Sequence, residues 1–177
     1  AGMKTFMIPW ISAENQEETL DKLSKTKAKA AFGHLELQGF AVYPGNVQQH
    51  GMETNVLDKF QIVCSGHYHT RSNNGKIFYL GNPYQLFWND VNDKRGFNFF
   101  DTETFELEFV QNPYTMFERI YYEDQKPQLF NTEPYKDKIV KIIVRKKSNQ
   151  LQFEKFVDKI YKTGVVDIKI VENFEVN

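Results

Sequence analysis

Two short apolar runs in this chain each lead into a glycine and a histidine. The run 29–32 precedes Gly33-His34, and the run 60–63 precedes Gly66-His67-Tyr68-His69. Apolar runs of this length that end at glycine are typical of buried β-strands. Functional residues concentrate in the loops that follow such strands. This repeated junction therefore constrains the fold and the site more than any other feature of the sequence.

The histidines at these junctions are candidate metal ligands. In extended backbone, positions i and i+2 point to the same side, which predicts that His67 and His69 aim into one cleft. Imidazole commonly binds transition metals, and the ions of a dinuclear site lie roughly 3.5–4 Å apart. His34 joins them from the matching junction. A structural role remains the alternative for each, and His50, in a glycine-rich loop, is placed outside the metal shell.

A dinuclear hydrolytic site also needs oxygen ligands, because carboxylates bridge the ions and lower the pKa of bound water. No acidic residue stands in a convincing ligand pattern. The candidates are Glu36, Glu53, Asp58, Asp90 and Asp93. The sequence therefore predicts imidazole ligands without their carboxylate partners.

Two other residue groups admit a functional and a structural interpretation. The net charge of −1 excludes a generally basic surface, so any DNA contact must come from a local patch. The contiguous cations Arg145, Lys146 and Lys147 predict either a grip on the phosphate backbone or a lysine-protected edge strand. Four aromatic residues either stack on bases or belong to the core. They are Trp10, Tyr84, Phe87 and Trp88.

Cysteine content and hydropathy bear on the compartment. Cys64 is the only cysteine, so no internal disulfide can form, and a reducing, cytoplasmic location is expected. Its apolar neighbours predict a small buried side chain rather than a metal thiolate. The chain has no run of about eighteen apolar residues, which predicts that it does not span a membrane.

The element pattern predicts an α+β fold in two domains. A surface helix is expected over 14–26, a hairpin over 96–110 and a last strand over 116–122. After a proline-bearing linker at 123–134, a strand, an amphipathic helix and a strand predict a small βαβ unit. The expected domains are therefore 1–122 and 123–177.

Several motifs resemble those of the calcineurin-like metallophosphoesterases, and in particular the SbcD-type DNA repair nucleases. Among these, the similarity is greatest to the recombination endonuclease subunits of T-even-like phages. The match covers about 5–122. The matching segments are Ile8-Pro9-Trp10, Gly33-His34-Leu35-Glu36-Leu37-Gln38-Gly39-Phe40, His50-Gly51, Ser65-Gly66-His67-Tyr68-His69-Thr70, Tyr79-Leu80-Gly81-Asn82-Pro83, Arg95-Gly96-Phe97 and Phe100-Asp101-Thr102-Glu103-Thr104.

The resemblance implies a β-sandwich flanked by helices, followed by a small capping domain that helps to hold DNA. It implies that His34 and His67 bind one ion of a dinuclear manganese centre and that His69 binds the other. The implied activity is metal-dependent exonuclease and endonuclease cleavage of DNA in recombination and double-strand-break repair. The implied partners are an SbcC-type ABC ATPase and a second copy in a homodimer.

The chain departs from the family in its missing early motifs. Asp-x-His, Gly-Asp-x-x-Asp and Gly-Asn-His-Asp do not occur. The chain therefore resembles the C-terminal half of such a nuclease, and we expect it to be inactive alone, to bind metal weakly and to self-associate. A non-catalytic DNA-binding or partner-docking module is the alternative. A phosphoesterase acting on another phosphodiester or a phosphoprotein is the third hypothesis.

Overall fold

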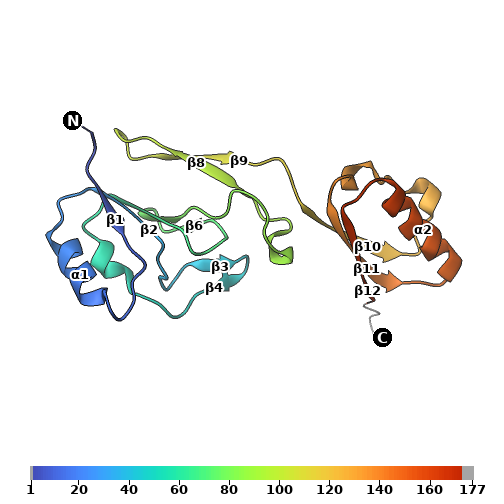
Figure 1. Ribbon diagram of the computed structural model, residues 1–177, viewed down its shortest axis with the longest axis horizontal. Helices are drawn as coiled ribbons and strands as arrows, with labels where there is room; N and C mark the ends of the chain where they lie inside the picture. Colours follow the sequence, from blue (N-terminus) through green and yellow to red (C-terminus); the bar gives the residue numbers. More distant parts are fainter. Residues whose placement is uncertain (1, 173–177) are drawn as a thin grey trace. The chain divides into compact units, whose positions relative to one another are not determined.

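The computed structural model describes residues 2–172 and shows two compact units, one ending at Pro113 and the other beginning at Tyr114 (Figure 1). Both units combine helix and strand, which confirms the predicted mixture of α and β structure. No helix among the described residues is both long and apolar enough to cross a membrane.

The first unit is built on a sheet whose strands are parallel except for β6. Its order is β1-β2-β5-β7-β6. Ile8 lies opposite Gly33, Gly33 opposite Ser65, and Ser65 opposite Tyr79. The carboxyl ends of four strands therefore meet at one edge of the sheet. The strands are β1 (Thr5–Ile8), β2 (Ala30–Gly33), β5 (Ile62–Ser65), β6 (Ser72–Asn73) and β7 (Ile77–Tyr79).

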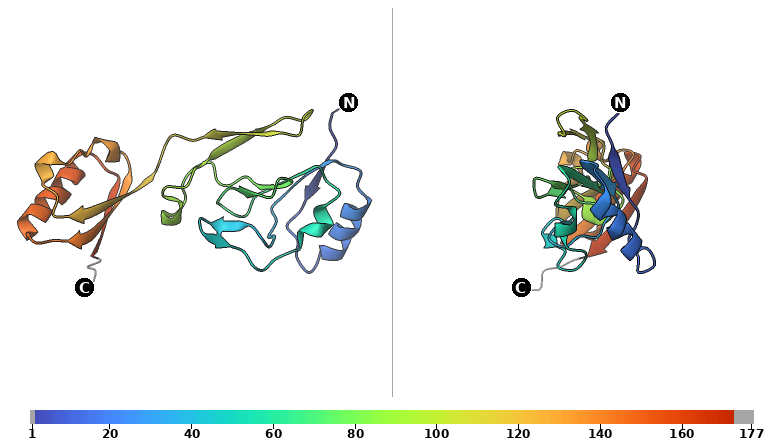
Figure 2. Two further views of the ribbon diagram at one scale, coloured as in Figure 1. Left: turned by 180° about the vertical axis from the view of Figure 1, so that it is seen from behind. Right: turned by 90° about the vertical axis from the view of Figure 1, so that its left-hand side faces the viewer.

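Both faces of this sheet are covered, which explains why its strands read as continuous apolar runs. Leu23 of α1 (Gln16–Lys25) and Leu57 of η1 (Thr54–Leu57) pack on one face with Val63. On the other face, Phe100 of the β8–β9 hairpin contacts Phe32 at 5.6 Å between ring centroids. Figures 1 and 2 show α1 and the hairpin on opposite sides of the sheet. The hairpin joins β8 (Gly96–Phe100) to β9 (Leu107–Gln111).

The glycine-rich loop that carries His50 also contains a small hairpin. It consists of β3 (Ala41–Tyr43) and β4 (Asn46–Val47). Behind it, Phe40 is buried and packs on Tyr79 at 4.9 Å between ring centroids. This loop is therefore anchored in the core of the first unit.

The second unit is a parallel sheet in the order β10-β11-β12 with α2 (Gln150–Lys162) packed on one face. The strand predicted to close the first domain, β10 (Phe117–Glu123), pairs instead with β11 (Ile139–Lys146). Its Tyr122 is buried against Phe153 and Phe156 of α2 at 4.9 Å. The boundary consequently lies at Pro113 rather than after residue 122. The third strand is β12 (Asp167–Glu172).

The segment predicted to be a linker, 123–134, is packed into the second unit. It forms η3 (Pro127–Leu129), and η4 (Glu133–Tyr135) follows before β11. Lys159 of α2 donates hydrogen bonds to the carbonyls of Pro127 and Phe130 at 2.8 and 2.7 Å. The segment is therefore the connection between two adjacent parallel strands, not a free linker between domains.

Candidate metal centre

The parallel register brings His34 and His67 together at the carboxyl edge of the sheet. Because Gly33 and Ser65 are register partners, the loops that follow β2 and β5 start side by side. The Gly66 N–H donates to the Gly33 carbonyl at 3.0 Å, and the two imidazole centroids lie 5.3 Å apart. Ligand sites of open parallel sheets commonly form outside such strand ends.

Gly66 makes room for the His34 ring. A Cβ atom at this position would lie 2.7 Å from Nδ1 of His34, closer than any side chain tolerates. Gly66 therefore has a specific role in the site. It fixes the position of one imidazole against the loop that carries the other.

The backbone of His67 does not have the extended conformation from which the shared direction of His67 and His69 was inferred. β5 ends at Ser65, and His67 has φ of 82°. A residue other than glycine in this region costs about 1–3 kcal/mol, and such strain concentrates at functional sites. His69 stacks on Phe87, with ring centroids 5.6 Å apart and ring planes 7° from parallel.

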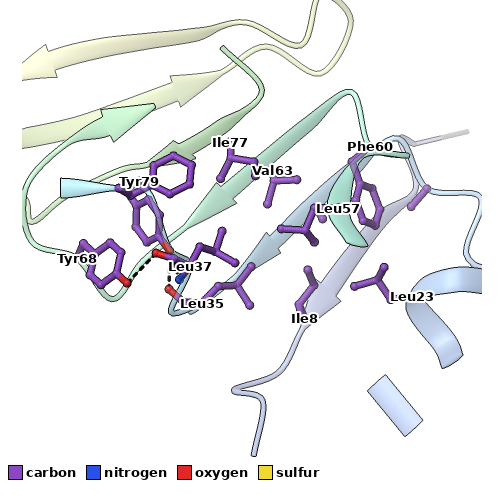
Figure 3. Packing of buried hydrophobic residues seen from close by; sticks show 13 residues of the cluster. Ile8, Leu23, Leu35, Leu37, Leu57, Phe60, Val63, Tyr68, Ile77 and Tyr79 are labelled. Atoms are coloured by element: carbon purple, nitrogen blue, oxygen red, sulfur yellow. Dashed lines mark hydrogen bonds between the residues drawn. The ribbon is translucent and has the colours of Figure 1, made fainter. Parts of the chain in front are cut away.

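Buried hydroxyl groups hold the loop that carries the first histidine. Tyr79 donates its hydroxyl to the carbonyl of Leu35 at 2.7 Å and accepts from the N–H of Leu37 at 3.0 Å. Tyr68 donates to the carbonyl of Leu37 at 2.9 Å, and Ser65 accepts from the N–H of Leu35. Figure 3 shows both tyrosines directed at this backbone from inside the core. The loop after β2 is therefore pre-organised by side chains of the neighbouring strands.

A buried ion-pair network holds the loops around His69. Arg95 donates to Asp90 at 2.9 Å, to Asp93 at 2.8 Å and to the carbonyl oxygen of His69. The Asp90 carboxylate also accepts from the N–H of Phe87, whose ring stacks on His69. Two of the acidic residues considered as metal ligands are therefore partners of a buried arginine.

The other acidic candidates also have partners inside the chain. Glu53 accepts from Asn55, and Asp58 lies 3.8 Å from the ammonium group of Lys76. Glu36 is exposed and accepts from Gln48 at 3.2 Å. Of the five candidates, Glu36 is the one whose charge raises the pKa of His67.

Burial and neighbouring histidines favour a neutral His67. Burial is the largest cause that lowers the pKa of His67, and the charges of His34 and His69 lower it further. The carboxylate of Glu36 opposes this effect by raising the pKa. A neutral imidazole has a free nitrogen lone pair, which is the form that binds a metal.

The donors of this chain fit part of a metal site. Residues 2–172 contain no group of three or more His, Cys, Asp or Glu side chains placed to hold one ion. Ligating histidines commonly donate their second N–H to a carboxylate or carbonyl. No such bond to His34, His67 or His69 is found in the described part of the chain. Two converging imidazoles can start a coordination shell, and further ligands are needed to complete it.

Most of the candidate stacking rings are exposed, and those of Trp10 and Phe87 contact histidines. Trp10, Tyr84 and Phe87 have exposed fractions of 49%, 47% and 58%, so the core interpretation is wrong for these three. Trp88 is half-buried. The Trp10 ring lies 5.2 Å from that of His67 and 5.9 Å from that of His34. Base stacking stays a prediction for the exposed rings.

The basic strand end, which we define as Arg145, Lys146 and Lys147, is paired with acids of the same unit. β11 is the middle strand of its sheet, so the interpretation as a protected edge strand is wrong. Each cation instead neutralises a carboxylate. The pairs are Arg145–Glu123 at 3.1 Å, Lys146–Asp124 at 3.3 Å and Lys147–Glu172 at 2.5 Å.

Sequence reasoning missed Arg95 as a supporting residue. Its charge separates it from the apolar core pattern, but the side chain is buried, with 4% exposure. A signal was available in the close spacing of Asp90, Asp93 and Arg95, because opposite charges so near one another can pair. The strained backbone of His67 left no comparable signal in the sequence.

Comparison of the sequence with known proteins identifies a relative. No family model matches the chain. The chain is similar to exonuclease subunit 1 of Enterobacteria phage T4. The two sequences are 36% identical over 179 aligned residues, which cover 96% of this chain. The chain spans about half, 49%, of the length of exonuclease subunit 1. The predicted resemblance to a nuclease subunit of T-even-like phages is confirmed.

Proposed function

We propose that this chain is the C-terminal half of a metal-dependent DNA exonuclease and endonuclease subunit that acts in recombination and double-strand-break repair. The observation that carries the proposal is the meeting of His34 and His67 at the carboxyl edge of a parallel sheet. The similarity to exonuclease subunit 1 supports it, because that similarity extends over nearly the whole chain.

In this proposal the histidines are the chain's contribution to a dinuclear manganese site. His34 and His67 bind one ion and His69 binds the other, while the missing half supplies the carboxylates. Such ions activate water and stabilise charge on a phosphate. Because the donors described above are incomplete, this chain alone binds metal weakly and does not hydrolyse DNA.

The first unit then forms part of a metallophosphoesterase β-sandwich, and the second unit forms the capping domain. The β-sheet packed on the β8–β9 hairpin is a two-layer arrangement compatible with half of a sandwich. Phe97 and Phe99 on the outer side of this hairpin are 50% and 60% exposed. Exposed rings of this kind fit an interface with the missing half or with a second copy in a homodimer.

Contact of Arg145, Lys146 and Lys147 with DNA stays a prediction. Each should contribute little to DNA affinity, because its charge is already paired with a carboxylate. We further propose that the assembled nuclease works with an SbcC-type ABC ATPase in the cytoplasm of a bacterial host. These partners follow from the resemblance of the motifs.

A second candidate function is a non-catalytic DNA-binding or docking module. The incomplete donor set among residues 2–172 favours it. The two candidates differ in what the missing half would do. It would create activity in the first case and none in the second.

A nuclease assay with Mn²⁺ on a labelled DNA duplex tests the proposal. The chain is assayed alone and after co-expression with an N-terminal half that carries the three missing motifs. We expect cleavage only from the assembled halves, and none when His67→Ala is introduced. Cleavage by the chain alone would contradict the division of ligands. No cleavage from halves that do associate would favour the docking module.

A further inference from the structure

A pocket of about 340 Å³ opens beside His34 at the same edge of the sheet. This volume lies at the lower end of the range for small-ligand sites. The pocket is lined mainly by apolar and neutral polar side chains and contains one carboxylate. Its principal lining residues are Trp10, Ile11, Gln16, His34, Glu36 and Met52.

The indole of Trp10 lines this pocket, and the backbone that carries it is held by hydrogen bonds of the Asn15 side chain. Asn15 donates from Nδ2 to the carbonyl of Trp10 at 2.8 Å and accepts from the N–H of Ser12 at 2.8 Å. The ring is also in contact with His34 and His67. An indole with these contacts that is still half-exposed offers a flat apolar face to a ligand.

We propose that this pocket, the Trp10 pocket, binds one unpaired nucleobase of a single-stranded nucleic acid by stacking on the indole. Neither lysine nor arginine is found among the residues that line it, and Glu36 carries a negative charge. The pocket therefore disfavours a phosphate and suits a neutral ring. Because His34 lines the pocket and His67 lies beside it, we expect the phosphodiester that adjoins a bound base to lie near these imidazoles. This inference rests on the proposed function, and it adds a base-binding site that selects unpaired strands.

Trp10 fluorescence offers a direct test, because the chain has two tryptophans. In the Trp88→Phe variant, Trp10 is the sole indole. A short single-stranded oligonucleotide is titrated in the presence of a metal chelator, and a strand of the same length with abasic sites serves as the control. We expect quenching by the strand that carries bases and none by the abasic strand. Equal quenching by both strands, or quenching by neither, would overturn the inference.

Affinity measurements give a second test with matched variants. Trp10→Ala is expected to weaken binding of the base-carrying strand by roughly 5- to 150-fold, the range for losing one base–aromatic stack. Trp10→Phe keeps an aromatic face and should retain most of the affinity. Tyr43→Ala removes a similarly exposed ring that does not line the pocket and should leave affinity unchanged. Equal losses for Trp10→Ala and Tyr43→Ala, with both variants folded by circular dichroism, would contradict a specific stack.

The alternative occupant is a segment of the missing half. Quenching of Trp10 by acrylamide distinguishes it, since a docked protein segment would shield the indole without nucleic acid. Such shielding would overturn the inference, whereas an indole that stays accessible until a strand is added would support it. These readouts need neither bound metal nor cleavage. If the assembled halves did not cleave DNA, the proposed function would be rejected. The fluorescence and affinity measurements would still show whether the Trp10 pocket binds a base.

Discussion

The histidine loops of the first unit and the basic strand end of the second unit look equally functional as sequence, yet their surroundings differ. His34 and His67 converge, border an exposed indole and have no hydrogen-bond partner for their imidazoles within residues 2–172. Arg145, Lys146 and Lys147 each face a carboxylate of their own unit. The imidazoles are therefore available to bind a ligand, whereas the charges of the basic strand end are already paired.

The difference shows that the contacts around a residue distinguish a functional site from an ordinary surface more clearly than the residue type does. Around the histidines the backbone of His67 is strained, Arg95 is buried, and Gly66 leaves space for the imidazole of His34. Around the basic strand end the chain forms partly exposed ion pairs, and such pairs contribute little to stability.

The largest expected effect is a loss of stability when the buried ion pair of Arg95 is removed, compared with the exposed pair of Arg145. Arg95→Ala leaves Asp90 buried without its partner, so we expect the free energy of unfolding of the first unit to fall by about 3–5 kcal/mol. Arg145→Ala removes an exposed pair and should cost about 0–1 kcal/mol. Urea unfolding followed by tryptophan fluorescence and circular dichroism measures both. Similar losses for the two variants would remove the distinction.

A second prediction concerns the space that Gly66 leaves for His34. Gly66→Ala should displace the imidazole and lower the Mn²⁺-dependent nuclease rate of the assembled halves by about 100-fold, as small misplacements at a reaction centre can. Gly39→Ala is the control, because its Cβ would meet no atom within 4 Å although its φ of +87° is strained. That control should lose stability and keep its rate. An active Gly66→Ala enzyme would show that His34 need not be held there.

A smaller effect is expected at the basic strand end. Replacing Arg145, Lys146 and Lys147 by Gln together should weaken binding of duplex DNA by less than about threefold, because their charges are already neutralised. The salt dependence of the affinity provides the readout. A decrease in its slope by about three, one for each cation, would show that all three grip phosphates after all. Lys22→Gln, which breaks an exposed pair on α1, is the charge control.

The smallest expected effect is the reactivity of the Cys64 thiol, which tests how firmly β5, the strand before His67, is packed. Cys64 is buried with 2% exposure, and burial raises the pKa of its thiol to about 11. We expect negligible reaction with a thiol reagent near neutral pH until the first unit unfolds. Rapid labelling of the native chain would mean that the strand opens readily, which would weaken the case for pre-organised histidines. Denatured protein supplies the full-reaction control.

Much of this architecture follows from local pattern. The Gly-His junctions, the apolar runs before them and the amphipathic α2 were readable because strand and helix periodicities are local properties of the sequence. The role of Cys64 as a small buried side chain was readable for the same reason.

Long-range pairing was not readable in this way. The assignment of β10 to the second unit depends on packing of Tyr122 against α2, which lies about thirty residues further along the chain. The ion pairs of Arg145 and Lys146 depend on the end of β10 lying beside the end of β11. The left-handed backbone of His67 depends on the loops around it. Each of these is fixed by tertiary contact rather than by residue type.

Binding of Mn²⁺ tests the central claim that the histidine loops are half of a metal site. Electron paramagnetic resonance of Mn²⁺ can count bound ions for the chain alone, for the assembled halves and for assembled halves that carry His34→Ala or His67→Ala. The account predicts weak binding by the chain alone, tight binding after assembly and loss of tight binding in both variants. Tight binding that survives both substitutions would place the metal elsewhere and contradict the account.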